Sequence, residues 1–199
     1  MAFSNARDGG TNSGGRLWLW PVAILVGFPI GGLVADLVVN GVDSVAAALA
    51  GGLITGAIIG YAEWVALRQW VSWTWILATV AGMGAGLVAG AALVDYGIER
   101  GDLLLMGAVT GVAVGVLQAL VLARRRIPGA GWWVLANPPA WALGWYVSSY
   151  VISRTIDERW PIFGASGALA FGLLTWLLLR QLLRGRATGE PVPEAAAAR

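Results

Sequence analysis

The sequence lacks cysteine, histidine and lysine, and all 13 of its basic residues are arginine. Without cysteine and histidine, the chain has no disulfide and no thiolate or imidazole ligand for a metal ion. Without lysine it cannot form a Schiff base with a carbonyl cofactor, and without histidine it lacks the usual base of serine-hydrolase chemistry. We therefore expect no metal and no cofactor. A paired-aspartate protease using Asp36 and Asp95 is the enzymatic alternative, but both residues fall at the predicted outer ends of helices in loop-like settings, so we expect no enzymatic activity.

Charged residues are scarce, at 12% of the chain, whereas 58% of residues are hydrophobic and the mean hydropathy is +0.72. A soluble domain of 199 residues would need a charged surface to remain dissolved. Here the charges cluster between apolar runs of about 20 residues, long enough for a helix to cross a bilayer. The composition predicts an all-α, multi-pass membrane protein, and the bias toward Ala, Gly and Arg is typical of a GC-rich bacterial genome.

Six apolar segments, separated by turn and charge signals, predict a bundle of six transmembrane helices. Residues 1–16 are expected to form a disordered cytoplasmic N-terminus, and residues 185–199 a disordered cytoplasmic tail. The membrane domain spans residues 17–184 between them. Its predicted helices cover residues 17–38, 44–69, 73–96, 102–123, 131–153 and 162–183.

Arginine is divided unequally between the two sets of alternate loops, ten residues against three. Because basic loops are retained in the cytoplasm, this bias predicts that both termini are cytoplasmic and that the chain lies in the inner (plasma) membrane. The same bias accounts for the pI near 9.5, so we expect no nucleic-acid partner. The run Arg124, Arg125 and Arg126 is expected at the inner surface, in contact with anionic lipid headgroups.

Nine of the twelve tryptophans lie near the predicted inner boundary. Amphipathic indole rings favour the headgroup level, so an anchoring belt is the first interpretation. An aromatic binding cage is the alternative. The nine are Trp18, Trp20, Trp64, Trp70, Trp73, Trp75, Trp132, Trp133 and Trp176.

Small residues recur at four-residue spacing in every predicted helix, and the pattern returns after about 56 residues. Helices in lipid associate through close backbone packing, which such GxxxG-type stripes permit. The sequence predicts three αα-hairpin repeats, over residues approximately 17–70, 73–126 and 130–184, with threefold pseudosymmetry. In the even-numbered helices the stripes are Gly52, Gly56, Gly60; Gly107, Gly111, Gly115; and Gly164, Ala168, Gly172.

A polar residue follows the last small residue of each of these stripes by three positions, and further polar residues stand opposite on the next helix. We expect Glu63 to pair with Thr79, and Gln118 with Asn137. Thr175, the polar residue of the third stripe, would face Ile24 if the last helix packs against the first to close a ring. The candidate site is therefore Glu63, Thr79, Gln118, Asn137 and Thr175.

Glu63 stands in a segment otherwise suited to hydrocarbon, and three interpretations compete. A neutral or Arg68-paired carboxyl would join the second and third helices. Alternatively, the carboxyl would be a proton- or cation-coupled transport site, because ionisable groups within the membrane are costly and often mark pathways. The third interpretation is contact with lipid headgroups by snorkelling.

The stretch "ANPPAW" contains two adjacent prolines, Pro138 and Pro139. Because proline has no backbone N–H, the carbonyls of Val134 and Leu135 lose their usual partners, and we expect the helix to kink or open there. Broken helices line substrate sites in some transporters, although proline kinks also occur in membrane helices with no special role.

The frames "EWVALR", "TWLLLR" and "WWVLAN" resemble those of uncharacterised bacterial multi-pass proteins with repeated Q-W-x-x-L-R and W-W-x-x-A-T hairpins. The resemblance covers residues 17 to about 184 and implies a fold and a membrane location, with no activity to carry over. Two functions remain open. The first is a non-enzymatic scaffold or accessory subunit, with lipids and a membrane-protein partner or a second copy as partners. The second is a small transporter or channel using Glu63 and the Asn137–Pro139 stretch.

Overall fold

The computed structural model describes residues 17–152 and 164–187, which form six α-helices and no strand. Each predicted helix is present, with its ends within four residues of the expected positions. The predicted tails lie almost wholly outside the described residues. The helices are α1 (Leu19–Val39), α2 (Val45–Leu67), α3 (Thr74–Leu93), α4 (Arg100–Arg124), α5 (Ala130–Ile152) and α6 (Ala165–Ala187).

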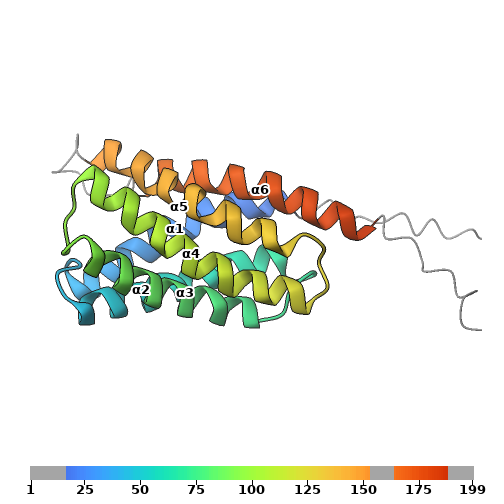
Figure 1. Ribbon diagram of the computed structural model, residues 1–199, viewed down its shortest axis with the longest axis horizontal. Coiled ribbons are helices and arrows are strands. Elements are labelled where there is room, and N and C mark those ends of the chain that lie inside the picture. Colours follow the sequence, from blue (N-terminus) through green and yellow to red (C-terminus); the bar gives the residue numbers. More distant parts are fainter. Residues whose placement is uncertain (1–16, 153–163, 188–199) are drawn as a thin grey trace, which may run out of the picture.

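The helices form an antiparallel ring in which each packs against the next in sequence and α6 packs against α1 (Figure 1). The antiparallel sense is visible in the α2–α3 pair, where Gly52 lies against Met83 while Gly60 lies against Ile76. As a result, the starts of α1, α3 and α5 and the ends of α2, α4 and α6 share one end of the bundle. We call this the tryptophan end and the opposite one the acidic end, after the residues described below.

Local sequence signals account for the helix boundaries at the acidic end. The Ser44 hydroxyl accepts a hydrogen bond from the Ala47 N–H and caps the start of α2. Glu99 and Asp102 form a reciprocal capping box at the start of α4. Asn40 ends α1 in the left-handed conformation, with φ of 52°, which asparagine tolerates better than most residues. These short polar connections turn the chain back into the bundle.

Five of the six helices, all except α5, are long and apolar enough to cross a membrane. Their outward faces carry large apolar side chains, among them Leu37 on α1 and Leu93 on α3, which are 74% and 63% exposed. Such surface would be unfavourable in water and is favourable in lipid. The chain is therefore an all-α protein with the helices of a multi-pass membrane protein.

Close backbone approach between neighbouring helices occurs at the small residues. A Cβ placed on Gly56 of α2 would lie 2.8 Å from the Cα of Val80, and one on Gly82 of α3 would lie 2.7 Å from the Cα of Val114. Each helix presents such a residue to the next helix around the ring. The other four contacts are Gly31 with Thr55 of α2, Gly111 with Pro138 of α5, Gly144 with Phe171 of α6 and Gly172 with Ile24 of α1.

Helix α5 continues through Pro138 and Pro139 without interruption, so the helix does not open there, while the alternative expectation of a kink stays a prediction. The backbone is tightly enclosed there, because a Cβ on Gly111 of α4 would lie 2.8 Å from the Cα of Pro138. The first of the two carbonyls without a helical N–H partner belongs to a half-buried residue and the second to Leu135, which is 66% exposed. Packing against α4 keeps the segment helical despite the missing donors.

Candidate functional site

Three tryptophans meet on the axis of the bundle, one from the first turns of each odd-numbered helix. Trp20, Trp75 and Trp133 are fully buried, and their ring centroids are 6.3, 6.0 and 5.9 Å apart in the three pairs. Edge-to-face and tilted arrangements at this separation are favourable for aromatic rings. For these three residues the expected position in a headgroup belt is wrong, because their side chains fill the interior. Others fit the belt better: Trp18, Trp73 and Trp132 are 58%, 60% and 65% exposed.

Each axial indole donates a hydrogen bond to the polar residue of the preceding even-numbered helix in the ring. Trp75 Nε1 donates to Glu63 Oε2, and Trp133 Nε1 donates to Gln118 Oε1, both at 2.9 Å. Trp20 Nε1 donates to Thr175 Oγ1, also at 2.9 Å, across the α6–α1 contact that closes the ring. Because an indole has one donor and no acceptor, each tryptophan needs such a partner when buried.

Glu63 is the centre of the largest hydrogen-bond cluster. Its Oε2 accepts from Trp75, from Thr79 Oγ1 at 3.1 Å and from Gln118 Nε2 at 2.9 Å. The expected Glu63–Thr79 pair is therefore present, and a third helix, α4, joins through Gln118. Within the described residues, the hydrogen-bond partners of Glu63 are neutral, and no ion pair links it to Arg68.

Gln118 connects two of the three polar positions, and its role differs from the one we expected. Its amide nitrogen donates to Glu63 and, at 2.8 Å, to Thr79 Oγ1, while its carbonyl oxygen accepts from Trp133. The expected pairing with Asn137 is wrong. Instead, Asn137 Nδ2 donates to the Trp133 carbonyl one turn back on its own helix, at 2.8 Å. The longer glutamine side chain reaches past its neighbour toward the carboxylate, which is the stronger acceptor.

The third polar position is simpler. Thr175 Oγ1 accepts from Trp20 and donates to the Phe171 carbonyl at 2.7 Å, so the hydroxyl is satisfied within α6 and α1. The ring closes there as the expectation required, with Gly172 against Ile24. Ile24 is the apolar residue at the position where Thr79 and Asn137 stand in α3 and α5.

Five buried side-chain polar atoms have no hydrogen-bond partner among the described residues. They are Thr110 Oγ1 on α4, which faces Gly86 of α3, Asn137 Oδ1 and Trp141 Nε1 on α5, and Ser166 Oγ and Trp176 Nε1 on α6. Two of them belong to residues near the helical turn at Pro138 and Pro139. Unpaired buried polar atoms are uncommon in protein interiors. Here they are spread over α4, α5 and α6.

Three donors converge on one oxygen of Glu63, its Oε2. Two of these donors are on α3 and the third is on α4, so the side chain of Glu63 joins three helices. No group of three or more Asp or Glu residues occurs in the described part of the chain. The chemistry of the cluster is hydrogen bonding between α2, α3 and α4.

Arg124, Arg125 and Arg126 are exposed at the tryptophan end, where α4 stops. This is where a lipid-headgroup contact would require them. Arg68 and Arg180 are at the same end, so basic side chains gather on the side of the bundle where the axial tryptophans lie.

The residue pattern did not directly predict that the indole N–H groups of the axial tryptophans donate hydrogen bonds to this cluster. A signal existed nonetheless: the small residues of each odd-numbered helix stand 7, 11 and 15 positions after its tryptophan. Those intervals are close to whole turns, so the tryptophan must share the inward face of the stripe. No protein-family model, no curated protein and no solved structure matches the chain.

Proposed function

We propose that the chain is a six-span protein of the inner (plasma) membrane that acts without catalysis, as a scaffold or accessory subunit. The observation that carries this proposal is the enclosure of Glu63. The carboxylate is 1% exposed, accepts from three donors on two other helices and does not line the cavity of the bundle. A residue in that setting stabilises helix contacts.

The sixth span in this proposal is α5. It has 23 residues and packs between α4 and α6, both of which are long and apolar enough to cross a membrane. A helix antiparallel to two crossing neighbours spans the same thickness. Its hydropathy is lowered by an asparagine, two prolines and several tryptophans, of which Asn137, Trp133 and Trp141 are buried in the interior.

Three hairpin repeats are part of the same proposal. Support comes from the axial tryptophans, each of which donates to an even-numbered helix across a contact between hairpins. The small residues support it as well, because every helix presents them to its successor around the ring. This common relation is what a triplicated hairpin would produce.

Cytoplasmic termini are supported by the charge difference between the two ends. Among the described residues, Asp36, Asp43, Asp95, Glu99 and Asp102 lie at the acidic end with a single arginine, Arg100. The other described arginines lie at or near the tryptophan end. Because arginine is retained in the cytoplasm, we assign that end to the inner side of the membrane.

Reconstitution distinguishes this function from transport. Liposomes containing the full chain and a pH-sensitive dye are compared with liposomes containing the Glu63→Gln variant. Under the scaffold proposal neither preparation conducts protons or Na⁺ above the rate of empty liposomes. Flux through the unmodified chain that is lost in Glu63→Gln would refute it and would establish the transport alternative.

A positive test of the scaffold role uses the chain extracted with its surrounding lipid. Native mass spectrometry of such particles is expected to give a defined complex, either with a second membrane protein or with another copy of the chain. A single copy bound only to lipid, at every expression level, would contradict the proposal.

A further inference from the structure

The interior of the bundle is hollow toward the acidic end. A cavity of about 450 Å³ lies between the six helices there, and all six contribute to its wall. Its floor includes Phe28, Met83 and Trp141, each eight residues after an axial tryptophan and therefore about 12 Å further along the axis. Phe171 completes the floor through ring contacts with Phe28 and Trp141 at 5.5 and 5.1 Å. The cavity thus ends before the layer that contains Glu63.

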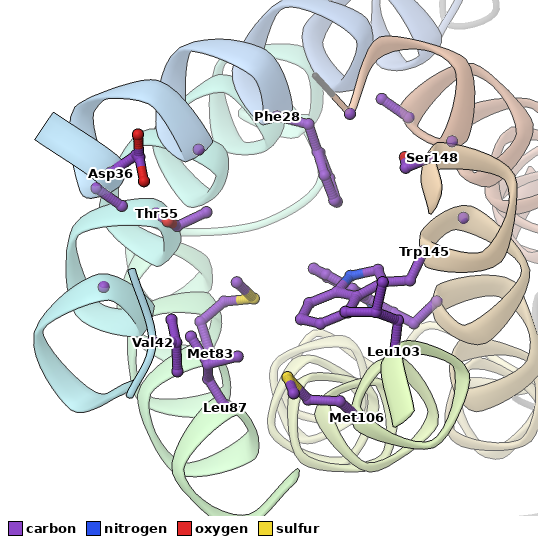
Figure 2. Close-up of a pocket in the computed structure, with 18 of the residues that line it drawn as sticks. Phe28, Asp36, Val42, Thr55, Met83, Leu87, Leu103, Met106, Trp145 and Ser148 are labelled. Carbon is purple, nitrogen blue, oxygen red and sulfur yellow. The ribbon is translucent and has the colours of Figure 1, made fainter. Parts of the chain in front are cut away.

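The wall of this cavity is apolar and adaptable. Figure 2 shows Phe28, Met83 and Trp145 directed toward the middle of the space, with Leu87 and Met106 beside them. Aromatic rings and flexible thioethers accommodate apolar bodies of varied shape. A cavity of this volume falls in the range that holds small organic molecules.

One carboxylate, that of Asp36, lies at the margin of the space on α1 (Figure 2). It is the only ionisable acidic or basic side chain among the described residues that line the cavity, apart from the weakly acidic hydroxyl of Tyr96. No arginine is among the described residues of the wall. An apolar cavity with one negative charge at its edge is complementary to an apolar molecule with one positive charge.

The surrounding charge strengthens this preference. At the acidic end the described residues include four further carboxylates, and the one arginine, Arg100, has its guanidinium 4.4 Å from the ring centroid of Tyr150. A lipophilic anion approaching this end meets a negative potential, whereas a lipophilic cation is attracted. Exposed aromatic faces inside the cavity add a further attraction for a cation that enters.

We propose that this cavity binds a lipophilic organic cation, with its apolar body between Phe28, Met83 and Trp145 and its charge facing Asp36. Entry is from the acidic end, which the assigned orientation places on the outer side of the membrane. Binding here does not depend on a protein partner, so it stands or falls separately from the scaffold role.

Tetraphenylphosphonium and tetraphenylborate are nearly identical in shape and opposite in charge, which makes them a matched pair of probes. Equilibrium dialysis is carried out with the full chain in nanodiscs of zwitterionic lipid, and empty nanodiscs correct for partition into the bilayer. We expect saturable binding of tetraphenylphosphonium with one site per chain. Tetraphenylborate is expected to show only the uptake of empty nanodiscs.

Two variants test the site itself. Asp36→Asn removes the charge from an exposed position and is expected to weaken tetraphenylphosphonium binding by about twofold to fivefold. Its control is Asp43→Asn, which removes a nearby exposed carboxylate outside the cavity wall and should weaken binding less than Asp36→Asn does. Gly51→Leu fills the cavity, since a Cβ at Gly51 meets only Val39, at 3.6 Å, and should reduce binding more than tenfold.

The outcomes are decisive in either direction. Equal binding of both ions, or equal losses in Asp36→Asn and Asp43→Asn, would overturn the assignment of charge recognition to Asp36. Undiminished binding in a folded Gly51→Leu variant would overturn the cavity as the site. If Gly51→Leu fails to fold, the comparison between the two aspartate variants still decides the proposal.

Discussion

Two adjacent glycines of α2, Gly51 and Gly52, should respond to alanine in opposite ways. Both are buried on the same helix, yet their surroundings differ. A Cβ on Gly52 would lie 2.6 Å from the Met83 carbonyl oxygen and 2.9 Å from the Gly84 Cα, both backbone atoms of α3. A Cβ on Gly51 would meet only the Val39 Cγ2, at an ordinary contact distance of 3.6 Å.

The magnitude follows from these distances. Ordinary contacts of a Cβ begin near 3.4 Å, so Gly52→Ala requires α2 and α3 to separate by about 0.5–0.8 Å. A gap of about 0.5–1 Å removes roughly a quarter to a half of the dispersion energy of each affected contact. Overpacking of this kind costs about 1–3 kcal/mol, against a helix-propensity gain of about 0.5–1 kcal/mol. We expect Gly52→Ala to lower the free energy of unfolding by about 1–2 kcal/mol and Gly51→Ala to leave it unchanged or raise it by up to about 1 kcal/mol.

The free energy of unfolding is measured by titrating SDS into mixed micelles that contain the full chain, with far-UV circular dichroism and tryptophan fluorescence as independent probes. Each variant serves as the control for the other, because they have the same composition and differ by one position. Equal effects of the two substitutions, or a stabilising Gly52→Ala, would refute the claim that backbone contact between α2 and α3 holds this part of the bundle together.

Three further predictions concern the axial layer and the topology. Trp75→Phe should lower the free energy of unfolding by about 1.5–3 kcal/mol, and Trp20→Phe should lower it by about 1 kcal/mol less. The first substitution removes a hydrogen bond to a carboxylate, whereas the second removes one to a hydroxyl. Equal losses in the same SDS titration would argue against this difference. Thr79→Val should cost about 1–2 kcal/mol, since its hydroxyl joins the carboxylate and the amide of the cluster; a change within about 0.3 kcal/mol would make that hydroxyl dispensable. In a chain without native cysteine, Asp43→Cys should react with an impermeant maleimide in intact cells and Arg125→Cys only after permeabilisation, and the reverse pattern would invert the assigned orientation.

The six helices were predictable because apolar runs, turn signals and caps all agree along this chain. The Glu63–Thr79 contact was predictable from helical spacing alone, since residues at equal depth on adjacent antiparallel helices face each other. In these respects local sequence and tertiary structure give the same answer.

The role of Trp20, Trp75 and Trp133 was not predicted, because indole rings near a helix end satisfy two different environments. A ring at the headgroup level and a ring in the interior both place an apolar body in a dry region with one donor bonded. The two positions are distinguished only by whether the tryptophan lies on the same face of its helix as the small residues. The prediction that Gln118 pairs with Asn137 failed because the glutamine side chain is long enough to reach Glu63 on α2, beyond the helix that is its neighbour in sequence.

The prolines of α5 illustrate how packing overrides a local signal. Taken by itself, a pair of prolines indicates an interruption. In the folded chain, Gly111 of α4 lets the two backbones approach so closely that the helical path is retained. The cavity could not be predicted from the sequence either. A cavity depends on how all the surrounding helices pack, and no residue pattern within a single helix indicates it.

The contact between α6 and α1 closes the ring of helices, so the chain could in principle start at any helix. It is made by a small residue and by an indole that donates to a polar side chain of the preceding helix, as at α2–α3 and α4–α5. A circularly permuted gene that joins the two tails and starts in the turn between α2 and α3 would keep every interhelical face intact. Under the proposed triplication, a single hairpin would carry both of the faces that three separate copies need to assemble into a similar ring.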